Sequence, residues 1–403
     1  MDTPSDSSTT SNPFRPGAGR VPPELAGRDQ LLTDVSRLMD QMLADAEGDR
    51  PIVISGLRGV GKTVLLNEFV RRARGSSRWI AIKLEATVGR SLAQMLAREL
   101  HNELRKIASP GDRAKDAVSR LLRVFRSFQV TADPTGNYSF GFDLSAESGV
   151  ADSGDFERDV NDLLEALGLA ARALDMGVLI AIDELQDATR ADLNGLNLAL
   201  HDLGQDAWPV PLLVIGAGLP SLPSVLADAT SYAERLYDYR TLGLLNPDET
   251  REALEVPASQ RGVHWDADAI DLALASTRGY PYFVQACGKH VWDARATASR
   301  ISLDDARVGV DRAREEVDRG LYQSRWDRAT PAQRTLMKAM AEDDDRPSAI
   351  QDLVARTGKS RPSDLSVSRG ELIKNGHIYS PDRGFVAFTV PGMSDFIRRK
   401  VLD

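Results

Sequence analysis

The sequence predicts an α/β protein: a parallel five-stranded sheet between helices, then a helical lid, then a small C-terminal winged-helix domain. Three observations support this fold class. Through residue 245, short apolar runs alternate with amphipathic helical stretches, as in parallel sheets with helical crossovers. Residues 247–297 contain helical patterns only. From residue 331 onward, three helical stretches precede an alternating hairpin, which is the order of a winged helix.

The composition is typical of a cytoplasmic protein of two or three domains. Of 403 residues, 42% are hydrophobic and 27% charged, and no apolar run approaches the roughly 18 residues of a membrane span. The start lacks the basic and apolar segments of a secretion signal, and a single cysteine, Cys287, excludes an intramolecular disulfide. The net charge of −9 argues against coating nucleic acid by charge alone. The preference for Arg over Lys hints at a GC-rich bacterial genome.

Changes in composition divide the chain into segments. The first is rich in Ser, Thr, Pro and Gly, which predicts a disordered tail. The connector before the last domain is charged on all sides, so we expect it to be exposed or lightly packed. The expected segments are a tail at 1–22, a core at 23–245 with a hairpin inserted at about 128–143, a lid at 246–300, a connector helix at 301–327 and the winged-helix domain at 328–403.

Residues 51–66 carry the most specific motif. A β-branched run, Ile52-Val53-Ile54, leads into Gly-x-x-x-x-Gly-Lys-Thr, and an amphipathic helix follows, which is the context of a phosphate-binding P-loop. Its glycines let successive N–H groups face a polyphosphate, and the helix N-terminus adds positive charge. Lys62 would reach the β- and γ-phosphates, and the Thr63 hydroxyl would bind Mg²⁺. The motif predicts an ATP site formed by Gly56, Gly59, Val60, Gly61, Lys62, Thr63 and Val64.

The turn ahead of the P-loop, Gly27-Arg28-Asp29, leads into a helix through Leu31 to Met42. Arg28 could line the adenine pocket, and the same residues also fit a plain lead-in to the helix. Both interpretations stay open.

The middle of the core continues the alternation. We expect a helix at 62–74, a strand at 78–84, helices at 91–108 and 112–127, and a long helix at 155–176. Residues 128–132 and 138–143 alternate around a Pro-Thr-Gly-Asn turn, which predicts a hairpin. That hairpin could be a protrusion that binds a protein partner or a flap that packs on the core.

The apolar run 178–182 ends in two carboxylates, Asp183 and Glu184. Such a run is typical of a strand buried on both faces, and ligands of doubly wound sheets bind at strand carboxyl ends. Neighbouring side chains at a strand end point in different directions. We therefore assign Asp183 to Mg²⁺, through water, and Glu184 to activation of the attacking water.

The remaining core and lid elements follow in order. A buried strand at 209–218 ends in small residues, a helix covers 221–237, and a fifth strand lies within 236–245. The lid helices are expected at 248–254, 267–276 and 282–295, with a break at Thr277-Arg278-Gly279-Tyr280-Pro281 before the last.

The C-terminal segment has its own charge balance. From Arg328 on it carries 13 Lys and Arg against 10 Asp and Glu, so about +3, whereas the rest carries about −12. Basic residues fall on the third helix, its approach and the turn of the hairpin, where a winged helix contacts double-stranded DNA. The candidate contacts are Lys359, Arg361, Arg369 and Arg383, with Lys374 beside them. Winged helices also dock proteins, so both partners stay open.

Together these motifs resemble an AAA+ ATPase of the origin-recognition-type initiator class, or the neighbouring signal-transduction (STAND) ATPases, over about residues 22–403. The resemblance implies that Arg235 is an arginine finger offered to a neighbouring subunit in a homo-oligomer; a cation at a helix C-terminus is the simpler reading. Residues 215–218 lack the Asn or Thr of a polar sensor. Gly279-Tyr280-Pro281 resembles the Gly-x-Pro lid motif of STAND ATPases, which places Pro281 at the nucleotide. These departures favour a slow ATP-dependent switch, acting on DNA or on a protein.

Overall fold

A computed structural model describes residues 11–107, 129–132, 138–141, 164, 165, 167, 168, 171, 172, 174–205 and 210–399. The chain divides into two units, which are taken one at a time below. The sheet unit comprises Gln30–Gly56 and Lys62–Thr241. The lid unit comprises Met1–Asp29, Leu57–Gly61 and Leu242–Asp403.

The sheet unit is built on five parallel strands, which confirms the predicted sheet. Their order is β2-β5-β6-β1-β7, and every neighbouring pair is parallel. β6 therefore lies between β5 and β1, so its carboxyl end lies beside the carboxyl ends of both strands. The strands are β1 (Ile52–Ser55), β2 (Trp79–Glu85), β5 (Gly177–Asp183), β6 (Leu212–Gly218) and β7 (Asp238–Thr241).

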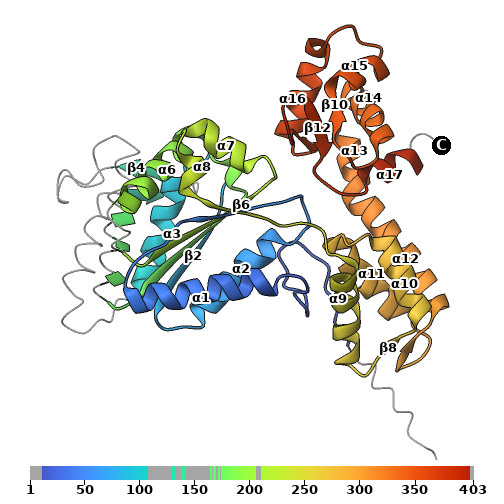
Figure 1. Ribbon diagram of the computed structural model, residues 1–403, viewed down its shortest axis with the longest axis horizontal. Coiled ribbons are helices and arrows are strands. Elements are labelled where there is room, and N and C mark those ends of the chain that lie inside the picture. Colours follow the sequence, from blue (N-terminus) through green and yellow to red (C-terminus); the bar gives the residue numbers. More distant parts are fainter. Residues whose placement is uncertain are drawn as a thin grey trace, which may run out of the picture. The chain divides into compact units, whose positions relative to one another are not determined.

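Helices cover both faces of this sheet (Figure 1). Alternate strand residues such as Ile82 and Ile180 pack against leucines of α3 and α6 in one core cluster. The helix predicted over 221–237 is two shorter helices, α7 and α8. The helices are α1 (Asp29–Asp45), α2 (Lys62–Arg74), α3 (Leu92–Ile107), α6 (Arg190–Gln205), α7 (Leu222–Ala229) and α8 (Ala233–Leu236).

The strands of the predicted hairpin are present. β3 (Gln129–Ala132) pairs antiparallel with β4 (Tyr138–Gly141), with Val130 opposite Phe140. The helix predicted at 112–127, most of the helix predicted at 155–176, and the hairpin turn lie outside the described residues.

The lid unit starts with a helical bundle. α12 packs along α11, where an added Cβ on Gly309 would lie only 2.4 Å from the Val291 Cα. The expectation of an exposed or lightly packed connector is therefore wrong, because Val310, Ala313 and Val317 are buried on one narrow stripe of α12. The elements are α9 (Pro247–Ser259), β8 (His264–Trp265), α10 (Ala267–Thr277), α11 (Pro281–Ala294), β9 (Arg300–Ile301) and α12 (Leu303–Val317).

A π-helical turn (Asp318–Gln323) and α13 (Ser324–Arg328) continue α12 into the C-terminal module, which we define as residues 331–397. Its strands form an antiparallel sheet in the order β10-β12-β11. The module contains α14 (Pro331–Met340), β10 (Ser348–Ala349), α15 (Ile350–Arg356), α16 (Ser366–Lys374), β11 (Ile378–Tyr379), β12 (Phe385–Phe388) and α17 (Met393–Ile397), with 3₁₀ turns at Ala341–Asp343 and Pro362–Leu365.

The N-terminal tail contains an anchored segment. Phe14 is only 3% exposed, lies edge-on to Trp292, and occupies space that an added Cβ on Gly288 would fill. Asn12 donates to the Lys289 carbonyl oxygen at 2.9 Å. The expected disorder of residues 1–22 is thus wrong for Asn12–Phe14, because one aromatic ring buries enough apolar surface to fix the backbone. In the part of the chain that the structure describes, no helix has the length and apolar character of a membrane span.

Candidate functional site

The loop after β1 presents backbone N–H groups at the start of α2. Gly59 and Gly61 have φ of +78° and +104°, a region that favours glycine. An added Cβ on Gly61 would meet no atom within 4 Å, and the first N–H groups of α2 have no intrahelical acceptor. Lys62, 6% exposed, donates from Nζ to the Gly56 carbonyl oxygen at 2.9 Å. A glycine turn at a helix N-terminus beside a lysine is an arrangement that suits an anion.

The end of β5 places two carboxylates beside each other in different surroundings. Asp183 is buried at 3% exposure, accepts a hydrogen bond from the Glu184 N–H at 3.1 Å, and has the Lys83 Nζ at 3.8 Å. Glu184 has left-handed backbone angles, φ 48° and ψ 39°, which turn the chain out of the strand. A non-glycine residue in this conformation carries strain of the kind that collects at functional sites.

Gln186 was missed by the sequence analysis. Its amide nitrogen donates to the Glu184 carboxylate at 2.6 Å, and its amide oxygen accepts from the Leu219 N–H at 2.9 Å. It lies in a 3₁₀ turn (Leu185–Asp187) next to the end of β6. A polar residue two positions after Glu184 was the available signal, but its partner on β6 could not be read without the strand order.

Arg28 holds the loop segment that belongs to the lid unit. It is 9% exposed and donates to the Val60 carbonyl oxygen at 3.2 Å and the Gly243 carbonyl oxygen at 2.9 Å. Burial lowers the pKa of the Arg28 guanidinium, and the charge of Glu249 partly opposes this effect. The Arg28 side chain, which is predicted to line an adenine pocket, therefore hydrogen-bonds to backbone oxygens of the P-loop and of the segment that follows β7.

Tyr280 packs on the same loop segment. An added Cβ on Gly59 would lie 2.2 Å from the Tyr280 hydroxyl oxygen. Tyr280 is the N-cap of α11 and Pro281 its first residue, so the predicted Gly-x-Pro motif fixes where this helix begins. Burial raises the pKa of the Tyr280 phenol, so the hydroxyl stays a neutral donor.

The C-terminal module also reaches this segment. The Arg58 N–H donates to the Thr389 carbonyl oxygen at 2.9 Å, and an added Cβ on Gly376 would lie 2.6 Å from the Arg58 guanidinium. His377, the next residue, is 6% exposed, and its Nδ1 has no hydrogen-bond partner among the described residues. Burial, and then the charges of Arg325, Arg328 and Arg58, lower the pKa of His377 to about 4.

Part of the chain, including the P-loop, matches a known protein family. Residues 24–215 match the family model of the AAA ATPase domain. They form an AAA ATPase domain. Residues 319–397 match a second model, described as a domain of unknown function (DUF8462). No curated protein sequence matches the chain.

Solved structures show the same fold for the whole chain. A Walker-type ATPase of Pyrococcus abyssi is 18% identical, with 93% of this chain and 96% of that chain covered and a TM-score of 0.54. The Aeropyrum pernix ORC2 protein, solved in ADPNP–ADP complexes, is 15% identical, with 96% and 98% covered and a TM-score of 0.56. The resemblance to an AAA+ P-loop ATPase of the origin-recognition type is confirmed at the level of fold.

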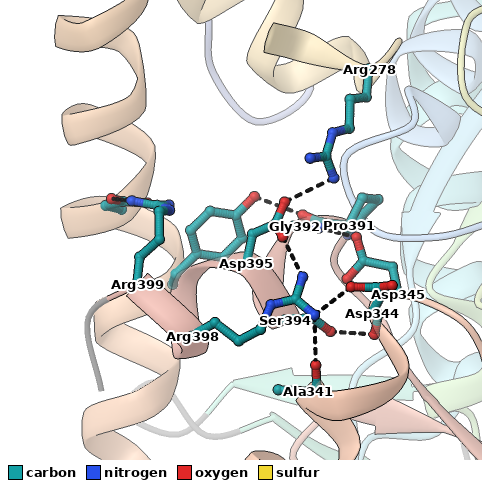
Figure 2. A network of polar contacts seen from close by, with 12 residues as sticks. Arg278, Ala341, Asp344, Asp345, Pro391, Gly392, Ser394, Asp395, Arg398 and Arg399 are labelled. Atoms are coloured by element: carbon teal, nitrogen blue, oxygen red, sulfur yellow. Dashed lines mark hydrogen bonds and ion pairs between the residues drawn. The ribbon is translucent and has the colours of Figure 1, made fainter. Parts of the chain in front are cut away.

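Beyond the ATPase domain, a polar network joins the lid helices to the C-terminal module (Figure 2). Arg278, in left-handed conformation at the end of α10, pairs with Asp395 of α17 at 2.8 Å. Arg398 pairs with Asp344 and Asp395, and Arg399 with Asp318 of the π-helical turn. The Tyr322 hydroxyl donates to the Pro391 carbonyl oxygen at 2.6 Å. These contacts tie the C-terminal end of the module to α10 and to the π-helical turn that leads into the module.

The structure places the other predicted residues as follows. Arg235 is exposed at the end of α8, with its carbonyl oxygen accepting from Arg50, and its role as a finger stays a prediction. Lys359, Arg361 and Arg383 are exposed and Arg369 is half-buried. Among the described residues, none of these four side chains forms an ion pair, whereas Arg356, Arg398 and Arg399 of the same region do.

The lowered pKa of His377 predicts acid-sensitive stability. Between about 6.5, its ordinary pKa, and about 4, the unfolded chain takes up a proton that the folded chain does not, so the free energy of unfolding falls as pH falls. From pH 7 to 4.5 we expect this group to contribute a loss of about 2 kcal/mol, absent in His377→Leu. Urea unfolding of both proteins at the two pH values measures it, with the exposed His264→Leu as control. Equal losses in wild type and His377→Leu would contradict the prediction.

Proposed function

We propose that this protein is an ATP-binding, slowly hydrolysing switch that regulates a DNA-associated process through a C-terminal winged helix. The proposal of a switch rests on the contacts that Leu57–Gly61 make. This part of the P-loop contacts the lid through Tyr280 and Gly59, and the C-terminal module through Arg58 and Thr389. A ligand that reshapes the loop would bind unequally to states that differ in these contacts, as a switch requires.

The residues of the ATPase domain fit the proposed chemistry. The open backbone at Gly61 and the N-terminus of α2 suit a polyphosphate, with N–H groups from Gly59, Val60, Gly61, Thr63 and Val64. Lys62 would exchange the Gly56 carbonyl oxygen for phosphate oxygens. Thr63 and the buried Asp183 offer hard oxygen atoms, which suit Mg²⁺, and Mg²⁺ would neutralise phosphate charge. Glu184 would orient and deprotonate the attacking water.

The C-terminal module supports contact with double-stranded DNA. Three helices and a three-stranded antiparallel sheet follow the order of a winged helix, in which α16 enters the major groove and the β11–β12 turn is the wing. The basic side chains that form no ion pair lie before α16, on it and in that turn, at Lys359, Arg361, Arg369 and Arg383. Phosphate contacts need charges that are not already neutralised within the protein.

One observation favours a second function, a signalling switch whose module docks a protein. Val367 and Ile373 of α16 are 77% and 38% exposed, and Phe385 of β12 is 40% exposed. Exposed apolar residues on a recognition helix suit a protein surface better than a phosphate backbone.

Turnover by the purified protein tests the proposed chemistry. We expect slow ATP hydrolysis that changes when duplex DNA is added. It should fall at least about a hundredfold in Glu184→Gln, since a general base contributes roughly that much, and it should also be lost in Lys62→Ala, which removes the contact to the phosphates. Phosphate release is the measurement, and Asp202→Asn, at an exposed position of α6, is the control. Turnover equal to that of Glu184→Gln would contradict the role of Glu184.

DNA binding tests the module. Replacing Lys359, Arg361 and Arg369 by Ala should weaken duplex affinity and lower the slope of log K against log salt by about 3, roughly one per phosphate contact. Removing three exposed arginines of the connector, Arg307, Arg312 and Arg319, changes the net charge equally and should leave the slope unchanged. Equal effects of both sets would argue against a DNA surface. No binding at low salt would favour the protein-docking function, to be tested next with Val367→Asp.

A further inference from the structure

The end of β6 carries no polar side chain, yet hydrogen bonds through Gln186 connect it to Glu184. Residues Gly216-Ala217-Gly218 occupy the position where the family resemblance leads one to expect a polar sensor. The Leu219 N–H, one residue beyond the strand, donates to the Gln186 amide oxygen at 2.9 Å. The polar group at the β6 end therefore comes from the turn after β5.

Both the nitrogen and the oxygen of the Gln186 side-chain amide form hydrogen bonds. Its Nε2 donates to the Glu184 carboxylate at 2.6 Å and to the Asp187 carboxylate at 3.3 Å, while its Oε1 accepts from Leu219. An amide has two N–H donors, so one group can serve both carboxylates at once. A neutral donor shared between two acids sets the direction of the Glu184 side chain.

Two glycines of β6 make room for this arrangement. An added Cβ on Gly218 would lie 2.3 Å from the Gln186 Oε1, and one on Gly216 would lie 2.7 Å from the Leu185 Cδ2. Both distances are shorter than real Cβ contacts, so the Gln186 and Leu185 side chains lie where they do because Gly218 and Gly216 have no side chains. The small residues at the end of β6 leave the space that the Gln186 side chain occupies.

The same strand end contacts the start of the P-loop. The Gly56 N–H donates to the Gly218 carbonyl oxygen at 3.1 Å, and the Gly56 carbonyl oxygen accepts from the Lys62 Nζ at 2.9 Å. Lys62, Gly56, Gly218, Leu219, Gln186 and Glu184 thus form one continuous run of hydrogen bonds and peptide links within the sheet unit. A shift of the Lys62 ammonium toward phosphate would change the first bond of this run.

We propose that Gln186 is the positioning residue for Glu184, and that it links the orientation of this carboxylate to the end of β6 and the start of the P-loop. The assignment rests on the proposed role of Glu184 in hydrolysis. Gln186 acts through Glu184 and the β6 backbone, so its loss should impair the rate of hydrolysis and leave ATP affinity intact.

Two substitutions separate this role from packing. Gln186→Met keeps the length of the side chain but removes both the donors and the acceptor, and we expect kcat to fall about tenfold, the lower end for lost supporting contacts. Gln186→Glu keeps an acceptor for Leu219 but sets a third carboxylate against Glu184 and Asp187, so kcat should fall further. The dissociation constant of a fluorescent ATP analogue should change less than about twofold in both. Gln41→Met, on the exposed side of α1, is the matched control.

A cycle with Glu184→Gln completes the test. Because Gln186 acts through Glu184, adding Gln186→Met to Glu184→Gln should lower the residual rate no further. An unchanged kcat in Gln186→Met, or a loss of kcat matched by an equal loss of affinity and of thermal stability, would overturn the assignment alone. A wild-type rate equal to that of Glu184→Gln would overturn the proposed role of Glu184, and this assignment with it.

Discussion

The backbone of the P-loop is kept open by contacts at its two ends, and the proposed function depends on this constraint. At one end, the Gly56 N–H is bound to Gly218 of β6; toward the other, the Val60 carbonyl oxygen is bound by Arg28. These contacts fix the backbone at both ends of the turn that contains Gly59. A loop that had to find this shape on binding would pay the ordering entropy at that moment.

The contacts of the loop also support the proposed switch. Arg58, Gly59 and Val60 each touch a different part of the lid unit: the C-terminal module, the start of α11 and the buried Arg28. A phosphate group bound to this segment would weaken or strengthen several of these contacts at once. Such coupling converts the free energy of nucleotide binding into a conformational change away from the loop. The C-terminal module, with its ion pairs to α10 and the π-helical turn, is the element that can change.

Local patterns predicted the parts of the site that depend on neighbouring residues in sequence. The octet from Gly56 to Thr63 and the strand that ends at Asp183 were both readable, because their spacing itself reflects the chemistry. Gln186 was not, because its meaning depends on β5 lying next to β6. Phe14 was hidden in a polar tail, and the buried stripe of α12 was masked by the charges around it. In each of these cases a single tertiary contact outweighed the composition of the segment.

The central claim is that ATP binding alters the contacts between the P-loop segment and the C-terminal module. Hydrogen–deuterium exchange of the full chain, with and without a nonhydrolysable ATP analogue, measures this directly, because the Arg58 N–H is bound to Thr389. The account predicts that exchange changes together in peptides covering 57–61 and 376–390, and that neither changes in Lys62→Ala. A change confined to residues 57–61, with 376–390 unaffected, would contradict it.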